Sequence, residues 1–116
     1  MAGMTKVFLS ADTNGDGILI AATASPGTLI HTAVSGTTQF DEIYLYAHNT
    51  SAAAVVMTIE IGGAAAVNQI KKTIPAQDGA ILVIPGFLLN NAQTIAAFAA
   101  TTNVINVHGW VNRGNL

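Results

Sequence analysis

The 116-residue chain contains no cysteine and few charged side chains. The missing cysteines exclude a disulfide framework, thiolate zinc ligands and a cysteine nucleophile. Charged residues make up only 9% of the chain, against roughly a quarter in an average soluble domain. A free monomer needs surface charge to stay dispersed, so the deficit predicts that much of the surface is covered by other subunits. This favours an assembled structural protein over a free enzyme.

A surplus of positive charge and a long apolar run are also missing. The net charge is −2 at pH 7. The cationic side chains form no stripe along the chain: Lys6, Lys71, Lys72 and Arg113. Nucleic-acid binding is therefore not expected. The most apolar run, residues 80–89, is about half the length needed to cross a membrane and is interrupted by Pro85 and Gly86. Because the first residues lack the pattern of a signal peptide, we expect synthesis in a cytoplasm.

What the sequence does have is an alternation of apolar and polar residues with period two, which is typical of strands. These segments are separated about every 10 residues by turn-forming residues, namely glycine, asparagine, aspartate and proline, as in sandwiches and barrels. The pattern predicts one all-β domain over residues 1–116, an antiparallel β-sandwich or jelly-roll-like barrel of about 8–9 short strands. The expected strands are residues 6–10, 18–22, 28–34, 42–49, 55–61, 69–74, 80–84, 94–100 and 104–111. Pro85-Gly86 is expected to form a turn, and little helix is expected.

Two of these strands carry large side chains on both faces. In residues 42–49, Ile43 and Leu45 lie on one face, and Tyr44 and Tyr46 on the other. Residues 104–111 show the same two-sided pattern, with Trp110 on the second face. One solvated face normally shows fewer large side chains. We therefore expect each strand to pack against the partner sheet on one side and against a neighbouring subunit on the other.

A candidate metal site lies near the start of the chain. Asp12, Asn14 and Asp16 match the opening of a calcium-binding loop, with a glycine next for the sharp turn. The glutamate that completes such a loop is absent, since Thr23 stands in its place. Asn-Gly and Asp-Gly are also favoured turn formers. A polar turn is the preferred interpretation, and a weak or structural calcium site is the alternative.

Catalytic patterns find no support. His31, His48 and His108 lack metal-ligand spacing, and each is interpreted as a partly buried, hydrogen-bonded strand residue. Asp41 and Glu42 are adjacent and should point to opposite faces of a strand, so they do not form a catalytic pair. The carboxylates are interpreted as solvated charges. No serine lies in a nucleophile elbow. No catalytic residue and no cofactor are predicted.

Core packing is the simplest explanation for most of the aromatic residues. Phe87 and Trp110 are the better candidates for a subunit interface, because such residues concentrate where subunits meet. Arg113, just beyond the last expected strand, belongs to the residue type that anchors interfaces by bidentate pairing. Residues 1–5, with Met4, are small and apolar and form a possible docking arm.

Several segments together resemble a known class of protein. They are residues 41–51 (DEIYLYAHNTS), 57–63 (MTIEIGG), 73–79 (TIPAQDG), 83–86 (VIPG), 95–101 (IAAFAAT) and 103–109 (NVINVHG). This run resembles small all-β virion proteins of tailed bacteriophages, especially capsid decoration (cement) proteins and related head or tail accessory proteins. The resemblance covers about residues 41–113 and adds no site residue.

The resemblance implies a subunit that is not an enzyme, made in the host cytoplasm and bound to the capsid surface of the virion. Its expected partners are the major capsid protein or other virion proteins, and a homo-oligomer, trimer or dimer. A location at the neck, tail or fibre base remains an alternative. A calcium- or carbohydrate-binding β-sandwich module is a second alternative, with Tyr44, Tyr46 or Trp110 as a surface on which a sugar stacks.

The charge deficit is concentrated in one part of the chain. No charged residue occurs between Gly79 and Asn112. Asp12, Asp16 and Asp41 all lie in the first half. If a large subunit interface exists, the C-terminal strands are its expected location.

Overall fold

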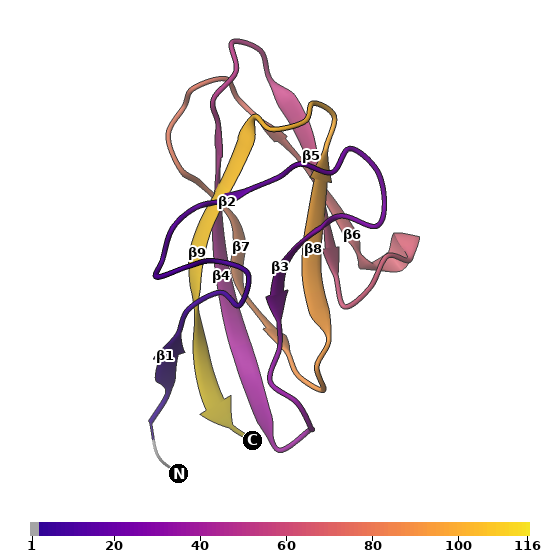
Figure 1. Cartoon of the computed structure of the whole chain (residues 1–116). Helices are drawn as coiled ribbons and strands as arrows, with labels where there is room; N and C mark the ends of the chain where they lie inside the picture. Colours follow the sequence, from indigo (N-terminus) through magenta and orange to yellow (C-terminus); the bar gives the residue numbers. More distant parts are fainter. Residues whose placement is uncertain (1–2) are drawn as a thin grey trace.

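The computed structural model describes residues 3–116, which form two antiparallel sheets packed face to face as a β-sandwich (Figure 1). Sheet A contains β1 (Thr5–Val7), β2 (Ile18–Leu19), β4 (Gln39–Asn49), β7 (Ile81–Leu89) and β9 (Ile105–Asn115). Sheet B contains β3 (Thr28–Thr32), β5 (Val55–Ile61), β6 (Gln69–Ile74) and β8 (Thr94–Ala99). A single 3-10 turn, η1 (Ala66–Asn68), is the helical element of the described residues. The predicted all-β sandwich is confirmed.

The order of the strands is that of a double-sheet jelly roll. Sheet A runs β1-β9-β4-β7, with β2 also pairing with β9, and sheet B runs β3-β8-β5-β6. β1 and β2 flank the same strand, so they act as one edge strand interrupted by the loop between them. Apart from that loop and the β5–β6 hairpin, every connection crosses from one sheet to the other. Such winding is characteristic of jelly rolls.

The period-two pattern places one set of side chains between the sheets. Along β4, Ile43, Leu45 and Ala47 are fully buried, while the residues between them are only partly covered. Their partners across the sandwich include Met57 and Ile59 of β5. Each buried aliphatic side chain contributes about 1.5–3 kcal/mol relative to an exposed one. In the described residues, the core cluster consists of aliphatic side chains and methionine and contains no aromatic ring.

The expected turn at Pro85-Gly86 is wrong. Both residues lie inside β7, which continues to Leu89 as the outer strand of sheet A. Proline has no N–H to donate, but an edge strand needs hydrogen bonds on one side only. The pairing with β4 shifts register between Ile43 and Tyr44, where Gly86 is left without a partner, and again between Leu45 and Tyr46. The edge position and these irregularities accommodate a dipeptide that elsewhere breaks strands.

The chain ends also differ from the expected boundaries. β9 extends through Arg113, which pairs with both Thr5 of β1 and Asp41 of β4. Of the proposed arm at residues 1–5, Met1 and Ala2 lie outside the described residues. Thr5 already belongs to sheet A and Met4 is half exposed beside it. The described end of the arm therefore extends the chain's own sheet.

Candidate functional site

The outer face of sheet A, turned away from sheet B, carries three stacked aromatic rings. Tyr44 of β4 lies directly opposite Trp110 of β9, and their ring centroids are 4.9 Å apart at an interplanar angle of 15°. Tyr46, two residues along β4, also stacks on Trp110, with centroids 5.9 Å apart. Cross-strand aromatic pairs of this kind contribute about 0.5–1.5 kcal/mol beyond their buried area. The rings thus form a rigid ladder at the centre of the face.

Beyond β9, the ladder continues onto β1. The ammonium group of Lys6 lies over the indole ring of Trp110, 5.6 Å from its centroid, in cation–π geometry. Val7 and Phe8 join these two residues around an open cleft of about 280 Å3. The Phe8 side chain is 62% exposed. The edge of sheet A therefore presents a large aromatic surface to solvent.

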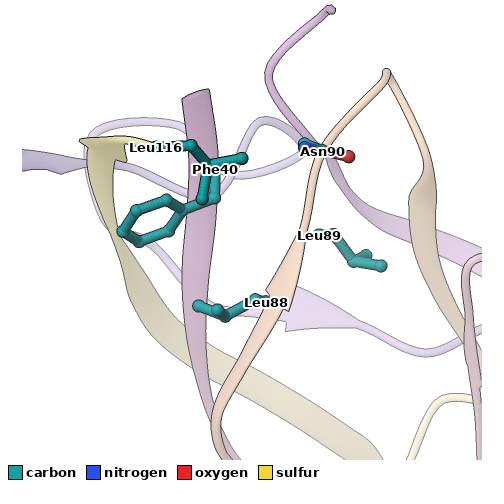
Figure 2. Close-up of a pocket in the computed structure, with 5 residues that line it drawn as sticks. All are labelled: Phe40, Leu88, Leu89, Asn90 and Leu116. Atoms are coloured by element: carbon teal, nitrogen blue, oxygen red, sulfur yellow. The ribbon is translucent and has the colours of Figure 1, made fainter. Parts of the chain in front are cut away.

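Apolar side chains continue the face towards the C-terminal end of β9. Phe40, Leu88 and Leu116 line a second cleft of about 190 Å3, and Figure 2 shows these three close together, while Leu89 projects to the other side of β7. The ring of Phe40 lies over Gly114, where an added Cβ would be 2.8 Å from the ring. The absence of a side chain at Gly114 therefore allows Phe40 to lie flat on the sheet.

Outward-pointing formal charges on the described strands of sheet A are confined to Lys6 and Glu42, which are connected through Asn112. Lys6 pairs with Asn112, and Asn112 with Glu42, so the three residues form one row across the sheet. The Lys6 ammonium donates to the Asn112 oxygen at 3.4 Å, and the Asn112 amide donates to the Glu42 carboxylate at 3.2 Å. The Tyr44 hydroxyl also donates to Glu42, at 3.1 Å, and this hydrogen bond raises the pKa of Tyr44 above its ordinary value. The two charges are therefore partly balanced within the face.

We call this surface the aromatic face. It consists of Lys6, Phe8, Phe40, Glu42, Tyr44, Tyr46, Leu82, Leu88, Trp110 and Asn112. It holds most of the aromatic residues of a chain with 4 Phe, 2 Tyr and 1 Trp. Core packing was the expected role of most of these rings, and that expectation is wrong. Isoleucine, leucine, valine, alanine and methionine fill the narrow space between the sheets instead.

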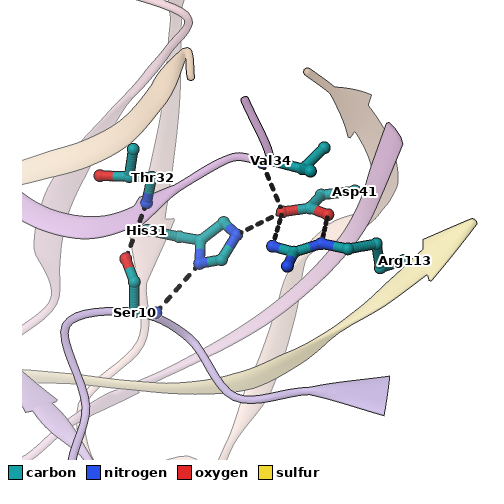
Figure 3. Close-up of polar contacts among 6 residues, drawn as sticks. All are labelled: Ser10, His31, Thr32, Val34, Asp41 and Arg113. Carbon is teal, nitrogen blue, oxygen red and sulfur yellow. Dashed lines mark hydrogen bonds and ion pairs between the residues drawn. The ribbon is translucent and has the colours of Figure 1, made fainter. Parts of the chain in front are cut away.

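A second polar cluster lies between the sheets, around Asp41 (Figure 3). Its fully buried carboxylate accepts two hydrogen bonds from Arg113, from Nε at 2.7 Å and from Nη2 at 3.0 Å. The backbone N–H of Val34 donates to the same carboxylate at 3.1 Å. The Nε2 atom of His31 lies 2.7 Å from Oδ2 of the same carboxylate. Because the Ser10 N–H donates to His31 Nδ1 at 3.0 Å, the proton of the neutral ring is on Nε2 and points to Asp41.

This cluster contains a serine, a histidine and an aspartate but lacks the geometry of a nucleophilic triad. The hydroxyl of Ser10 accepts a hydrogen bond from the Thr32 N–H at 2.8 Å, and only the backbone N–H of Ser10 contacts His31. The expected hydrogen-bonded role of His31 is confirmed. The cluster connects the loop after β1 and strands β4 and β9 of sheet A with β3 of sheet B, so its hydrogen bonds link the two sheets.

The expectation of solvated carboxylates is wrong for Asp41 and Glu60, although Asp41 and Glu42 do point to opposite faces. Burial alone would raise the pKa of Asp41, but the hydrogen bonds from Arg113 and His31 outweigh it and hold that pKa below its usual value. The buried Glu60 carboxylate accepts hydrogen bonds from the Ser25 hydroxyl and from the backbone of the same loop, between β2 and β3. Both carboxylates hold the fold together, and neither faces an open site.

The candidate metal loop adopts a polar turn. The Gly15 N–H lies 3.4 Å from the Asp12 carboxylate, and the Asp16 N–H donates to the Thr13 carbonyl at 3.0 Å. Asn14 and Gly15 have positive φ angles, 56° and 88°, as favoured turn residues do. Within residues 3–116, no group of three or more His, Cys, Asp or Glu side chains is placed to hold a metal ion. The geometry fits the preferred interpretation of this segment.

The predicted interface residues are distributed over different surfaces. Trp110 lies at the centre of the aromatic face, and Met4 lies near the ring of Phe40 at its margin. Phe87 is 40% exposed at the edge strand and pairs with the inward-facing Ile43, so it does not join them. Arg113 is engaged by Asp41 within the chain. Their role in an interface stays a prediction.

Sequence reasoning missed Phe8, Leu82 and Leu88 as companions of Trp110. Leu82 pairs with Tyr46, and Leu88 pairs with Glu42, so both belong to the outer face. The signal was the continuous apolar character of residues 81–89, which a buried strand also shows. Only the pairing with β4 distinguishes the outward-pointing positions.

Comparisons with protein-family models, with curated proteins and with solved structures each returned no match. In the described part of the chain, no helix is long and apolar enough to span a membrane.

Proposed function

We propose that this chain is a structural protein of a bacteriophage virion, a capsid decoration (cement) protein that stabilises the shell by bridging neighbouring capsid subunits. The observation that carries the proposal is the aromatic face. Aromatic rings placed outside the core, on a surface with few charges, are typical of surfaces that become buried in an assembly. The resemblance of residues 41–113 to virion proteins and the jelly-roll winding, which occurs in viral capsid domains, support it further.

Burial of apolar and uncharged polar surface across the subunit junctions, including the aromatic face, supplies the energy that holds the assembly together in this mechanism. Apolar area contributes about 25 cal/mol per Å2, so an interface of roughly 1,600 Å2 in total outweighs the entropy of association without any new ion pair. Few charges need to lose their water, because Lys6 and Glu42 are already linked through Asn112. Binding to particles should therefore weaken only slightly as salt concentration rises.

Particle binding and copy number test the proposal. Purified protein is mixed with capsids assembled without it, pelleted at low and high salt, and quantified on gels of washed particles. A decoration protein should be present in hundreds of copies (an order-of-magnitude expectation for a shell surface) and stay bound at high salt. A copy number of a few or tens favours the alternative location at the neck, tail or fibre base. Absence from particles, or a steep loss of binding with salt, contradicts the proposal.

The aromatic ladder also favours a second candidate, a carbohydrate-binding module. Tyr44, Tyr46 and Trp110 offer ring surfaces of the kind on which sugars stack, and jelly rolls also occur in lectins. Since the tyrosine rings already stack on the indole, part of its face is covered. Calorimetry with a panel of saccharides, with and without calcium, tests this candidate. Heat of binding that is lost in a Trp110→Ala variant would favour it, and the absence of heat throughout would remove it.

A further inference from the structure

We propose that the aromatic face binds a second copy of the chain and forms a two-fold symmetric dimer with the outer faces of the two A sheets in contact. This inference rests on the proposed function and deepens it, because the aromatic face would hold the two halves of the bridge together while other surfaces of each copy contact the capsid subunits. A dimer of this kind presents two identical sets of remaining surfaces, one on each side. It would therefore bridge two equivalent positions on a particle.

The size of the face matches what a stable dimer needs. β4 and β9 each contain 11 residues, and four strands lie side by side in sheet A. With a two-fold axis along β9, the strands that overlap with the second copy are β1, β9 and β4, and β7 lies outside the overlap. At about 3.3 Å per residue and about 4.8 Å between strands, the overlap measures roughly 36 by 14 Å, or about 500 Å2 in projection. A standard interface buries about 800 Å2 on each partner. Side chains that stand out from the sheet, and the loop between β1 and β2, which contains Phe8 and lies against His108, add to the projected area and bring it close to that value.

The charges of the face are complementary to themselves. Lys6 and Glu42 lie on either side of Asn112, each one strand away from it. A two-fold axis that runs along β9 places Lys6 opposite Glu42 of the second copy, and Glu42 opposite Lys6 of the second copy. Both pairs are then of opposite sign. Apart from the tyrosines, the other titratable side chains at or beside this surface include His48 and His108 on the strands and Asp12 and Asp16 in the adjoining loop between β1 and β2. A strongly acidic or basic partner would have no counterpart on this face.

The same axis places the aromatic ladder at the centre of the interface. Trp110 lies on β9 and would approach Trp110 of the second copy, while Tyr44 lies one strand away. Large aromatic residues at the centre of an interface provide most of its binding energy, and a polar rim adds less. Phe8, 62% exposed and next to β1, would face β4 of the second copy and become buried at the same time.

The experiment is to measure the molar mass of the full chain by light scattering and sedimentation, from about 1 μM to about 200 μM, a range that brackets modest dimer affinities. Trp110 is the single tryptophan, so its fluorescence reports on the face directly. We expect a dimer, with an emission shift to the blue and weaker quenching by acrylamide as concentration rises. A monomer over the whole range, a trimer or larger ring, or unchanged emission in a dimer overturns the proposal.

Matched variants locate the interface. Phe8→Lys beside β1 should raise the dimer dissociation constant at least about tenfold, whereas Val56→Lys, also exposed but on the outer face of sheet B, should change it less than about twofold. Circular dichroism melting verifies that both variants fold. If Val56→Lys dissociates the dimer and Phe8→Lys does not, the aromatic face is not the dimer interface.

A charge exchange tests the two-fold register. Lys6→Glu and Glu42→Lys should each weaken the dimer about tenfold by opposing like charges, and the double variant should recover most of the affinity. A double variant no better than the single ones overturns the arrangement. Particle binding is measured on the same samples. A monomer that binds particles contradicts the dimer alone, and a dimer absent from particles contradicts the proposed function alone.

Discussion

Replacing Asp41 by asparagine should destabilise the fold strongly, because this carboxylate is the acceptor for four donor groups. Arg113 supplies two of them, and His31 and the backbone N–H of Val34 supply the others. An asparagine side chain has the same shape but only one oxygen, and its amide group would face donors. Some of the buried donors around position 41 would then lose their acceptor.

The magnitude follows from the number of lost hydrogen bonds. A hydrogen bond to a charged group contributes about 1.5–3 kcal/mol, and Asp41→Asn removes about two of them. Arg113 is 29% exposed and recovers some solvation from water, which lowers the cost. We expect a loss of about 3–5 kcal/mol in the free energy of unfolding, the usual result of breaking a buried charged pair. At about 4 °C per kcal/mol for a chain of this size, the melting temperature should fall by about 12–20 °C.

The effect should also depend on pH. Because the pKa of Asp41 is lowered in the folded protein, its carboxylate contributes full stability above the unfolded-state pKa of about 3.9 and loses it as pH falls through the lowered value. The stability difference between the wild type and Asp41→Asn should therefore be constant from neutral pH down to about pH 5 and shrink in stronger acid.

Urea unfolding monitored by circular dichroism at several pH values measures both effects. The matched control is Glu42→Gln, which changes the neighbouring carboxylate on the solvent side of the same strand and should cost less than about 1 kcal/mol. The role assigned to the buried cluster would be refuted if the free energy of unfolding of Asp41→Asn were within about 1 kcal/mol of the wild-type value at pH 7. A stability difference that grows in acid would also refute it.

Three further predictions concern other parts of the molecule. Gly109→Ala should prevent folding, because the added Cβ would overlap the carbonyl oxygen of Tyr44. The control is Gly3→Ala, which should melt like the wild type because no atom lies within 4 Å of the added Cβ. Similar melting of the two variants would contradict the close approach of β4 and β9. Glu42→Gln should lower the pKa of Tyr44 towards its ordinary value, since a neutral acceptor replaces the charged one that raises it. An unchanged ultraviolet titration would show that the Tyr44 hydroxyl does not donate to Glu42. Glu60→Ala should make the loop between β2 and β3 more mobile, because it removes the acceptor of two hydrogen bonds from that loop. Faster proteolysis and hydrogen exchange in the loop would measure this. A loop as protected as in the wild type would show that these hydrogen bonds do not hold it.

The sequence predicted the strands well because alternation is a local property. All nine expected segments overlap a strand of the described structure, and the two faces of β4 were assigned correctly. The failures come from contacts distant in sequence. Whether Pro85 breaks a strand depends on its being at a sheet edge, and no local pattern shows which strand is the edge.

The candidate site was less predictable than the fold. Tyr44, Tyr46 and Trp110 were recognised as lying on a second face, but their stacking requires the pairing of β4 with β9, and Tyr44 and its partner Trp110 are 66 positions apart in the sequence. The buried Asp41 could not be distinguished from a solvated carboxylate, because its partners His31 and Arg113 come from two other strands. The local pattern of residues indicates which face of a strand a side chain lies on. Which residues it contacts there depends on the pairing of strands that are distant in sequence.

The position of β9 has a consequence for how the protein is made. Among the described strands, β9 comes last in the sequence, yet it lies inside sheet A and pairs with β1, β2 and β4. While the ribosome is still translating, β1 and β2 have no partner, and β4 exposes one unpaired edge. Sheet A therefore closes only after the C-terminal residues emerge, and contacts of such long range form slowly. Unfinished chains expose strand edges that favour aggregation, so C-terminal truncations should accumulate as insoluble protein.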